Sequence, residues 1–413
     1  MFRLIAFALL GLFTCWPAKA DIIPGRTFDR FISIWLGKQN YADVVKDPSI
    51  IELKKQGILL TNYYAHSHPS QPNYFAAIAG DYFGLDNDGH VRVPIQISTV
   101  VDLLDWRELS WKAYMEDLPG PGFLAAASDG STGNGAWDYV RQHNPFASFD
   151  SINLNGSRLL NIVSFNEWNA DVGAGAVPQY AFLTPNMMNN GRNTSLAHAT
   201  KWAREFIEPM LSGGVKGRTL ILLTYDEAGD DQAPNQVMSL LLGGSIPSSK
   251  KGTEDATFYT HYSILSTLQF NWQMPHLGRY DVGANIFQYV QDLGSKVLVA
   301  NKDPPNMGKV NNAGSYPGPL NSKDADKKLP YPPPNLGLKG SSGLPLLDHV
   351  VNLWGIRFKD DTPYDGNGTL YDASFPPQLV PQTPLVEEQE EQEHHHDHDL
   401  HNARADADED EDP

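Results

Sequence analysis

The sequence predicts an α/β fold with a mostly parallel central sheet and helices on both faces. Short apolar runs with the length of buried strands alternate along the chain with longer runs that are typical of helices. This alternation is typical of strand–helix–strand units, whose strands run parallel. The chain has 413 residues, 41% of them hydrophobic, which is enough for one large domain with a substantial core.

The elements are expected at regular intervals from residue 30 onwards. Strands are predicted over the apolar runs 30–36, 57–64, 110–115, 179–183, 218–225 and 237–242. Helices are predicted over the intervening runs 48–56, 75–80, 99–106, 161–170, 197–211 and 262–270. Gly57 ends the first of these helices and Gly213-Gly214 ends the fifth, because glycine commonly terminates helices.

Negative charge is concentrated at the end of the chain. The net charge is −18, and residues 387–413 hold 13 acidic residues and one arginine, so 13 − 1 leaves −12 there and −6 elsewhere. The mildly acidic body argues against a nucleic-acid partner. The tail has almost nothing to bury and is expected to be disordered. Its five histidines could alternatively bind a transition metal weakly.

The first twenty residues have the features of a secretory signal peptide. A basic residue precedes an apolar run over 4–13, and Ala18-Lys19-Ala20 forms a small-x-small cleavage site. The run is too short to span a bilayer, so we expect a secreted protein, extracellular or in the cell wall, without stable membrane insertion. The chain beyond this segment contains no cysteine. Three sequons are compatible with N-glycosylation, at Asn155, Asn193 and Asn367.

The stretch His68 to Tyr74 (HPSQPNY) joins the predicted strand 57–64 to the helix that follows. Ser70 is therefore expected at or near a helix start, where free N–H groups and the helix dipole favour an anion such as phosphate. A serine hydroxyl there is a candidate nucleophile if a neighbouring group activates it. The alternative is that Ser70 only caps the helix and His68 is a loop histidine.

Polar residues follow four predicted strands at their carboxyl ends, where open α/β sheets bind ligands. They are Ser70, the pair Glu116-Asp117, the amides Asn186, Asn189 and Asn190, and the pair Asp226-Glu227. Carboxylates are typical ligands of hard cations, although solvated loop acids or a helix cap would give the same pattern. His261 is a candidate metal ligand or acid/base group, or a surface histidine at a helix start.

In combination, these segments resemble the phosphoesterase family that contains secreted fungal acid phosphatases and bacterial phosphocholine-type phospholipases C. That family has an alkaline phosphatase-like core. The resemblance spans roughly residues 27–293. The matching segments, in chain order, are FDRF at 28–31, DP at 47–48, GILLTNY at 57–63, HPSQPNY at 68–74, Trp111, YMED at 114–117, HNPF at 143–146, TPNM at 184–187, YDE at 225–227 and HYS at 261–263.

The resemblance implies a hydrolase of small phosphate monoesters, of acid-phosphatase type. A serine or threonine at the position of Ser70 attacks phosphorus with the help of bound metal, and water then hydrolyses the phosphoenzyme. Asn73 is expected to help hold the phosphate. The expected catalytic residues are Ser70, Asn73 and His261. The expected ligands of a divalent metal ion are Asp226, Glu227 and Asn40.

Two departures from the family pattern fall on this expected metal site. Gly37-Lys38 stands where the family has Glu-Asn, and Asn-Asn-Gly-Arg-Asn at 189–193 stands where it has Asn-Asp-Gly-His-Asp. Both changes remove ligands and add cations, and ammonium and guanidinium groups bind phosphate. We therefore expect phosphate to bind more readily than divalent metal; alternatively, both cations point into solvent. The expected substrate-binding residues are His68, Lys38, Arg192 and Asn190.

Four segments are expected along the chain. They are a signal peptide over 1–20, a phosphoesterase domain over 21–296, a Pro/Gly-rich extension docking on the domain over 297–375, and the disordered acidic tail over 376–413. The predicted function is that of a secreted phosphatase with a serine nucleophile. The alternatives are a catalytically weakened or inactive relative that binds phosphate compounds, and a phosphodiesterase of phospholipase C type.

Overall fold

An eight-stranded sheet forms the centre of the computed structural model, which describes residues 22–129, 137–231, 234–294, 315–355 and 362–368. The predicted signal peptide and the predicted tail over 376–413 lie outside these ranges. The strand order is β11-β2-β10-β9-β1-β8-β4-β7. All neighbouring strands are parallel except β10 (Ser239–Leu242), which is antiparallel to β9 and β2. The predicted α/β fold with a mostly parallel sheet is confirmed.

The remaining strands of this sheet are β1 (Arg30–Leu36), β2 (Ile58–Leu60), β4 (Trp111–Met115), β7 (Ile162–Ser164), β8 (Tyr180–Thr184), β9 (Thr219–Tyr225) and β11 (Thr253–Asp255). Two small sheets pair β3 (Tyr63–Tyr64) with β12 (Tyr259–Thr260) and β5 (Ala127–Asp129) with β6 (Trp137–Val140). Strands β1 and β9 lie side by side in the main sheet, and almost every residue in them is buried. Such continuous apolar strands are expected where helices cover both faces of a parallel sheet.

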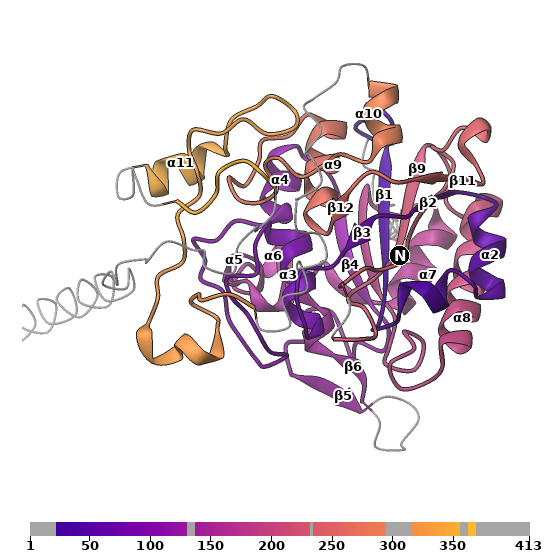
Figure 1. Cartoon of the computed structure of the whole chain (residues 1–413), viewed down its shortest axis with the longest axis horizontal. Helices are drawn as coiled ribbons and strands as arrows, with labels where there is room; N and C mark the ends of the chain where they lie inside the picture. Colours follow the sequence, from indigo (N-terminus) through magenta and orange to yellow (C-terminus); the bar gives the residue numbers. More distant parts are fainter. Residues whose placement is uncertain (1–21, 130–136, 232–233, 295–314, 356–361, 369–413) are drawn as a thin grey trace, which may run out of the picture.

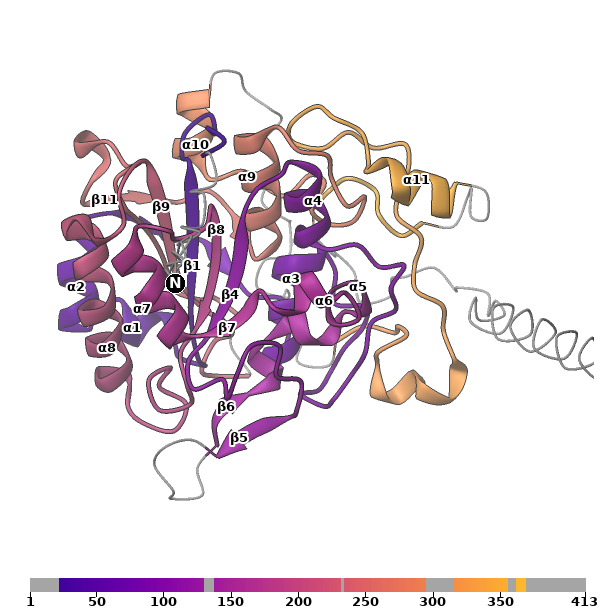
Figure 2. The ribbon, with the colours of Figure 1, turned by 180° about the vertical axis from the view of Figure 1, so that it is seen from behind.

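Helices cover both faces of the sheet, with α2, α7 and α8 on one side and α3, α4 and α9 on the other (Figures 1 and 2). The α-helices are α1 (Tyr41–Val44), α2 (Pro48–Lys54), α3 (Ser70–Ala79), α4 (Val100–Trp106), α5 (Asp150–Asn153), α6 (Gly156–Leu159), α7 (Phe165–Ala174), α8 (Leu196–Pro209), α9 (Tyr262–Trp272), α10 (Gln288–Gly294) and α11 (Asp348–Trp354). Within the described residues, no helix combines the length and the apolar character needed to cross a membrane.

Two predicted elements differ from the structure. The strand expected over 57–64 is divided, because β2 pairs with β10 and β11 whereas β3 leaves the main sheet and pairs with β12. The helix expected over 161–170 begins only at Phe165. Residues Ile162–Ser164 form β7, which pairs with β4 at the sheet edge, and Ser164 then caps α7. In both cases pairing with distant strands overrides the local pattern.

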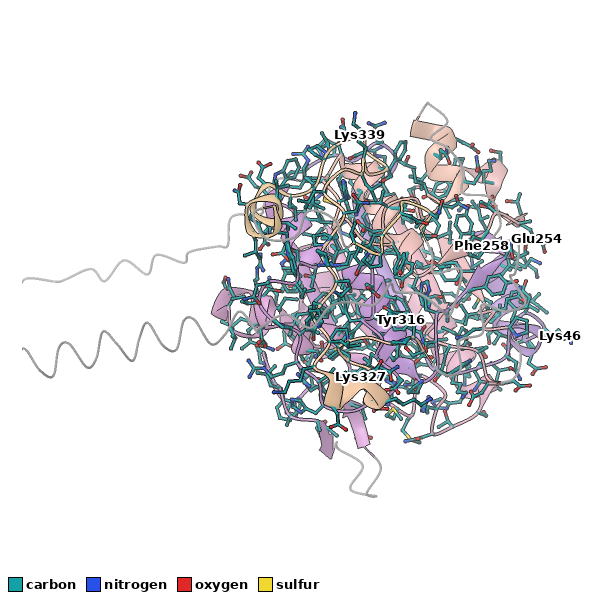
Figure 3. All side chains as sticks on the ribbon, turned by 60° about the vertical axis from the view of Figure 1, so that its left-hand side comes forward. Lys46, Glu254, Phe258, Tyr316, Lys327 and Lys339 are labelled. Atoms are coloured by element: carbon teal, nitrogen blue, oxygen red, sulfur yellow. The ribbon has the colours of Figure 1, made fainter. Side chains whose placement is uncertain are left out.

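A buried carboxylate ties the C-terminal extension to the helix that begins at Ser70. Helix α3 ends at Gly80, whose φ of 71° suits glycine, and Asp81 follows directly. The Asp81 side chain accepts hydrogen bonds from the hydroxyls of Tyr316 and Tyr364, both on the extension. Figure 3 shows Tyr316 where the extension crosses the body. The extension is therefore held at the residue that follows the serine helix.

We expect Asp81→Ala to lower the free energy of unfolding by about 3 kcal/mol or more, because two buried tyrosine hydroxyls lose their acceptor. Burial raises the pKa of Asp81, so part of the loss is offset by removing a buried acid. Urea denaturation of the variant measures the change. Tyr316→Phe removes only one donor and should cost clearly less. A loss below about 1 kcal/mol for Asp81→Ala would contradict the role of Asp81.

Candidate active site

The carboxyl ends of neighbouring parallel strands bring residues from four segments to one edge of the sheet. Lys38 follows β1, Glu227 follows β9, and Arg192 lies in the loop after β8. Ser70 is the first residue of α3, as the sequence predicts. Because β9, β1 and β8 are adjacent in the sheet, residues more than 150 positions apart in the chain meet at this edge.

Ser70 and Glu227 form the centre of the cluster. The Ser70 Oγ donates a hydrogen bond to Glu227 Oε1 at 2.9 Å, and both residues are 0% exposed. The helix is capped by Pro69, which offers no side-chain acceptor. The serine hydroxyl therefore donates its hydrogen bond to a carboxylate and does not cap the helix. A carboxylate in this position can accept the proton of the hydroxyl, which is the activation that a serine nucleophile needs.

Two side-chain cations flank this pair. Arg192 Nη1 lies 3.2 Å from Ser70 Oγ and 3.3 Å from Glu227 Oε1. Lys38 Nζ lies 4.0 Å from the other oxygen, Glu227 Oε2. The side chains are 29% and 27% exposed, respectively, so both cations point into the site from its solvent side. Ammonium and guanidinium groups in such positions can bind a phosphate group.

His68, Glu227 and Asp231 have the donor atoms of a possible metal site, because one ligand atom of each lies within 4.8 Å of the others. His68 Nδ1 bonds Glu227 Oε2 and lies 3.4 Å from Asp231 Oδ1. Asp231 is a residue that the sequence analysis does not single out. It lies in the loop after β9, and its side chain is 51% exposed.

The arrangement of charges does not fit a divalent cation among these three residues. The Lys38 ammonium already donates a hydrogen bond to Asp231, and Arg192 donates to Glu227. An added metal ion would compete with these two cations for the same carboxylates and would be repelled by their charge. The carboxylates of the group are thus neutralised by the chain itself.

Asp226 lies behind Glu227 in a fully buried position. Its Oδ2 accepts a hydrogen bond from the Tyr74 hydroxyl at 3.3 Å and lies 3.9 Å from His143 Nε2. Burial, together with the charge of Glu227, raises the pKa of Asp226 to about 8. Burial, with Arg192 nearby, lowers the pKa of His143 to about 3. Between these two values the Asp226 carboxyl and the His143 imidazole are therefore mostly uncharged.

Two predicted catalytic residues, Asn73 and His261, use their side-chain polar atoms in other contacts. The Asn73 side chain accepts from the backbone N–H of His66 and Ser67, and donates to the carbonyls of Ser67 and Pro69. Both ends of the amide are used to hold the loop before Ser70. Asn73 therefore positions this loop, and a role of Asn73 in holding phosphate stays a prediction.

His261 likewise uses both ring nitrogens in contacts with its surroundings, and its expected acid/base role stays a prediction. Its Nε2 lies 3.1 Å from the backbone oxygen of Asp226, and its Nδ1 lies 3.2 Å from the Tyr63 hydroxyl. The ring packs on Trp35 and is fully buried. Burial lowers the pKa of His261 to about 4. It fixes the backbone that carries Asp226, and neither ring nitrogen faces Ser70.

The remaining predicted residues divide into one that supports the site and one that lies beside it. Asn190 is buried; its Oδ1 accepts from the backbone N–H of Arg192 at 2.8 Å, and its Nδ2 lies 3.5 Å from His143 Nδ1. Asn190 thereby positions the loop that carries Arg192. Asn40, an expected metal ligand, starts helix α1 and packs against Gly229. Of the three expected metal ligands, Glu227 belongs to the group formed with His68 and Asp231.

Sequence reasoning missed Asp231, His143 and Tyr74. His143 belongs to the HNPF segment, which by itself predicts only a turn with a packing phenylalanine. In the structure its ring lies 5.3 Å from that of Tyr74, centroid to centroid, at the wall of the site. Asp231 follows Glu227 by four residues, but its neighbourhood has no regular pattern that indicates where the side chain points.

Residues 36–275 match the family described as the Phosphoesterase family. The chain is similar to the acid phosphatase of Aspergillus fumigatus, with 40% identity over 351 residues, which cover 83% of this chain and 77% of that protein. A probable acid phosphatase of Kluyveromyces lactis is 41% identical over 80% of this chain and 77% of its own length. Among solved structures, a protein in the alkaline phosphatase superfamily from Vibrio parahaemolyticus matches with a TM-score of 0.41 and 12% identity, covering 60% and 67% of the two chains.

Proposed function

Because the chain belongs to the phosphoesterase family, we propose that it hydrolyses small phosphate monoesters with Ser70 as the nucleophile. Its similarity to fungal acid phosphatases over most of its length makes it a hydrolase of phosphate esters. The observation that carries the assignment of Ser70 is its bond to Glu227, with the Arg192 guanidinium 3.2 Å from the same oxygen. Base and cation thus both contact the hydroxyl.

The proposed reaction has two steps. Ser70 Oγ attacks phosphorus, its proton passes to Glu227, and the bond from phosphorus to the alcohol oxygen breaks, so that the alcohol leaves with a proton taken from solvent. Water then attacks the phosphorus of the phosphoserine, the bond from phosphorus to Ser70 Oγ breaks, and Glu227 returns its proton to Ser70 as inorganic phosphate is released. Arg192 binds the phosphoryl oxygens and offsets the charge that develops on them. His68 bonds the second oxygen of Glu227 and keeps the first directed at the serine.

We infer that Lys38 and Arg192 supply the positive charge that a bound metal ion would otherwise give. A metal ion at such a site lowers the pKa of the nucleophile and stabilises phosphoryl charge. Lys38 donates a hydrogen bond to Asp231, and Arg192 donates one to Glu227. These contacts support a phosphate subsite that holds no metal ion. Two side-chain cations activate water less well than a metal ion does, so we expect slow turnover.

Hydrolysis of p-nitrophenyl phosphate by the purified protein tests this function. We expect measurable turnover at mildly acidic pH that survives treatment with a chelator and changes less than about twofold on addition of Mg²⁺ or Zn²⁺. Loss of activity on chelation that a divalent ion restores would contradict the metal-free subsite. Tight phosphate binding without any turnover would instead support the second candidate, a catalytically weakened relative, which the replaced ligands at Gly37 and Lys38 favour.

Secretion and glycosylation are part of the same proposal. The three sequon asparagines, Asn155, Asn193 and Asn367, are all exposed, as attachment of a glycan requires. Intact mass of protein taken from the culture medium, before and after deglycosylation, would give both the first residue and the glycan content. We expect the chain to start at Asp21.

A further inference from the structure

The serine is covered on its solvent side by three charged side chains. Ser70 and Glu227 are fully buried, whereas the side chains of Arg192, Lys38 and Asp231 are 29%, 27% and 51% exposed. Asp231 is the outermost of them. A phosphate group that approaches the serine therefore meets Arg192, Lys38 and the Asp231 carboxylate first.

The Asp231 carboxylate and a phosphate group are both anions, and both can bind the Lys38 ammonium. Lys38 Nζ donates a hydrogen bond to Asp231 Oδ1, and the nearest other acid, Glu227, is at 4.0 Å. This hydrogen bond is also the main cause of a lowered pKa of Asp231. Asp231 Oδ1 lies 3.4 Å from His68 Nδ1, on the side that leads to Glu227.

We propose that Asp231 competes with the phosphate of the substrate for Lys38. In the free protein the Asp231 carboxylate holds the Lys38 ammonium, and on binding the phosphate replaces it and Asp231 turns to solvent. The proposal rests on the proposed function for the identity of the substrate. It differs from a role of Asp231 as a metal ligand, in which Asp231, Glu227 and His68 would together bind a cation.

The competition follows from charge and exposure. A half-exposed ion pair is worth little, so a dianionic phosphate that also reaches Arg192 can displace Asp231. The displaced carboxylate is hydrated at small cost because it is already half exposed. Asp231 therefore weakens phosphate binding, and its removal should strengthen it. This direction is opposite to the effect of removing a metal ligand.

Isothermal titration of the full chain with inorganic phosphate tests the proposal. Asp231→Asn should lower the Kd for phosphate about threefold to tenfold relative to the wild type. The KM for p-nitrophenyl phosphate should fall in parallel, with kcat changed less than about twofold. The titration does not depend on turnover, so an inactive wild-type protein would defeat the proposed function and leave this test intact.

Two controls separate competition from general electrostatics. Asp230→Asn removes the same charge from the neighbouring exposed position and should change the Kd less than about twofold. In a Lys38→Met background, Asp231→Asn should no longer tighten phosphate binding. Equal effects of the two aspartate variants would overturn the proposal. The proposal would also be overturned if Asp231→Asn bound phosphate more weakly than the wild type or lost a tightly held divalent ion. Absence of phosphate binding in both the wild type and Asp231→Asn would overturn it as well.

Discussion

Ser70→Ala is expected to lower kcat for p-nitrophenyl phosphate by at least about a thousandfold, the largest effect of any single change in this protein. The serine oxygen is the nucleophile, and it is the atom in contact with both Glu227 and Arg192. Alanine keeps the helix start and removes only that oxygen. Steady-state kinetics at saturating substrate measure the change.

The same variant should still bind inorganic phosphate, because Arg192 and Lys38 are untouched. Titration calorimetry would show a Kd within about threefold of the wild type. Ser164→Ala is the matched control, since Ser164 stands at the start of helix α7 and its side chain caps that helix. That change should reduce stability by about 1 kcal/mol and leave kcat unaltered. A Ser70→Ala protein that retains near-normal kcat would rule out Ser70 as the nucleophile.

The second large effect is expected when four substitutions restore the ligands of the family pattern. Gly37→Glu, Lys38→Asn, Asn190→Asp and Arg192→His together should raise the affinity for a divalent metal at least tenfold, ~1.4 kcal/mol, and should weaken phosphate binding to the metal-free protein. Each change makes the site more negative by one unit with histidine neutral. A side chain at residue 37 is sterically possible, because a Cβ there would lie 3.4 Å from Asn190, an ordinary contact.

The four changes are made together because ligands of one site act as a unit and single changes can show nothing. Elemental analysis and phosphatase assays with added metal give the two readouts. Lys55→Glu with Lys201→Glu changes the net charge by the same amount at exposed helix positions, and should alter neither readout. A wild-type protein that already holds a divalent ion tightly, and loses nothing on substitution, would contradict the account.

Ser70 and Glu227 could be selected from the sequence because Ser70 opens a helix and Glu227 follows an apolar strand, and such positions converge on one edge of a parallel sheet. Lys38 and Arg192 were selected differently, because they replace residues of the family pattern. The sheet itself follows from the same apolar runs. Strands β7 and β11 of this sheet are the exceptions, since each has only three residues and is defined by its pairing, with β4 and β2 respectively.

Side-chain direction could not be predicted in the same way. Asn73 lies three residues beyond Ser70, yet its amide turns back to the loop backbone. His261 is brought to the site by α9 but its nitrogens meet Tyr63 and a backbone carbonyl. Asp231 contacts Lys38 through an irregular loop, where neither helical nor strand periodicity indicates direction. These contacts depend on the packing of segments far apart in the chain.

The central claim is that Ser70 carries the phosphoryl group during hydrolysis without a bound metal ion. Chelator-treated protein would be mixed with p-nitrophenyl phosphate, quenched in acid across a single turnover, digested and analysed by mass spectrometry. The account predicts one phosphoryl group on Ser70 that appears and decays at the rate of phosphate release. Phosphate release with no phosphoserine at any time, or with the phosphoryl group on another residue, would contradict it.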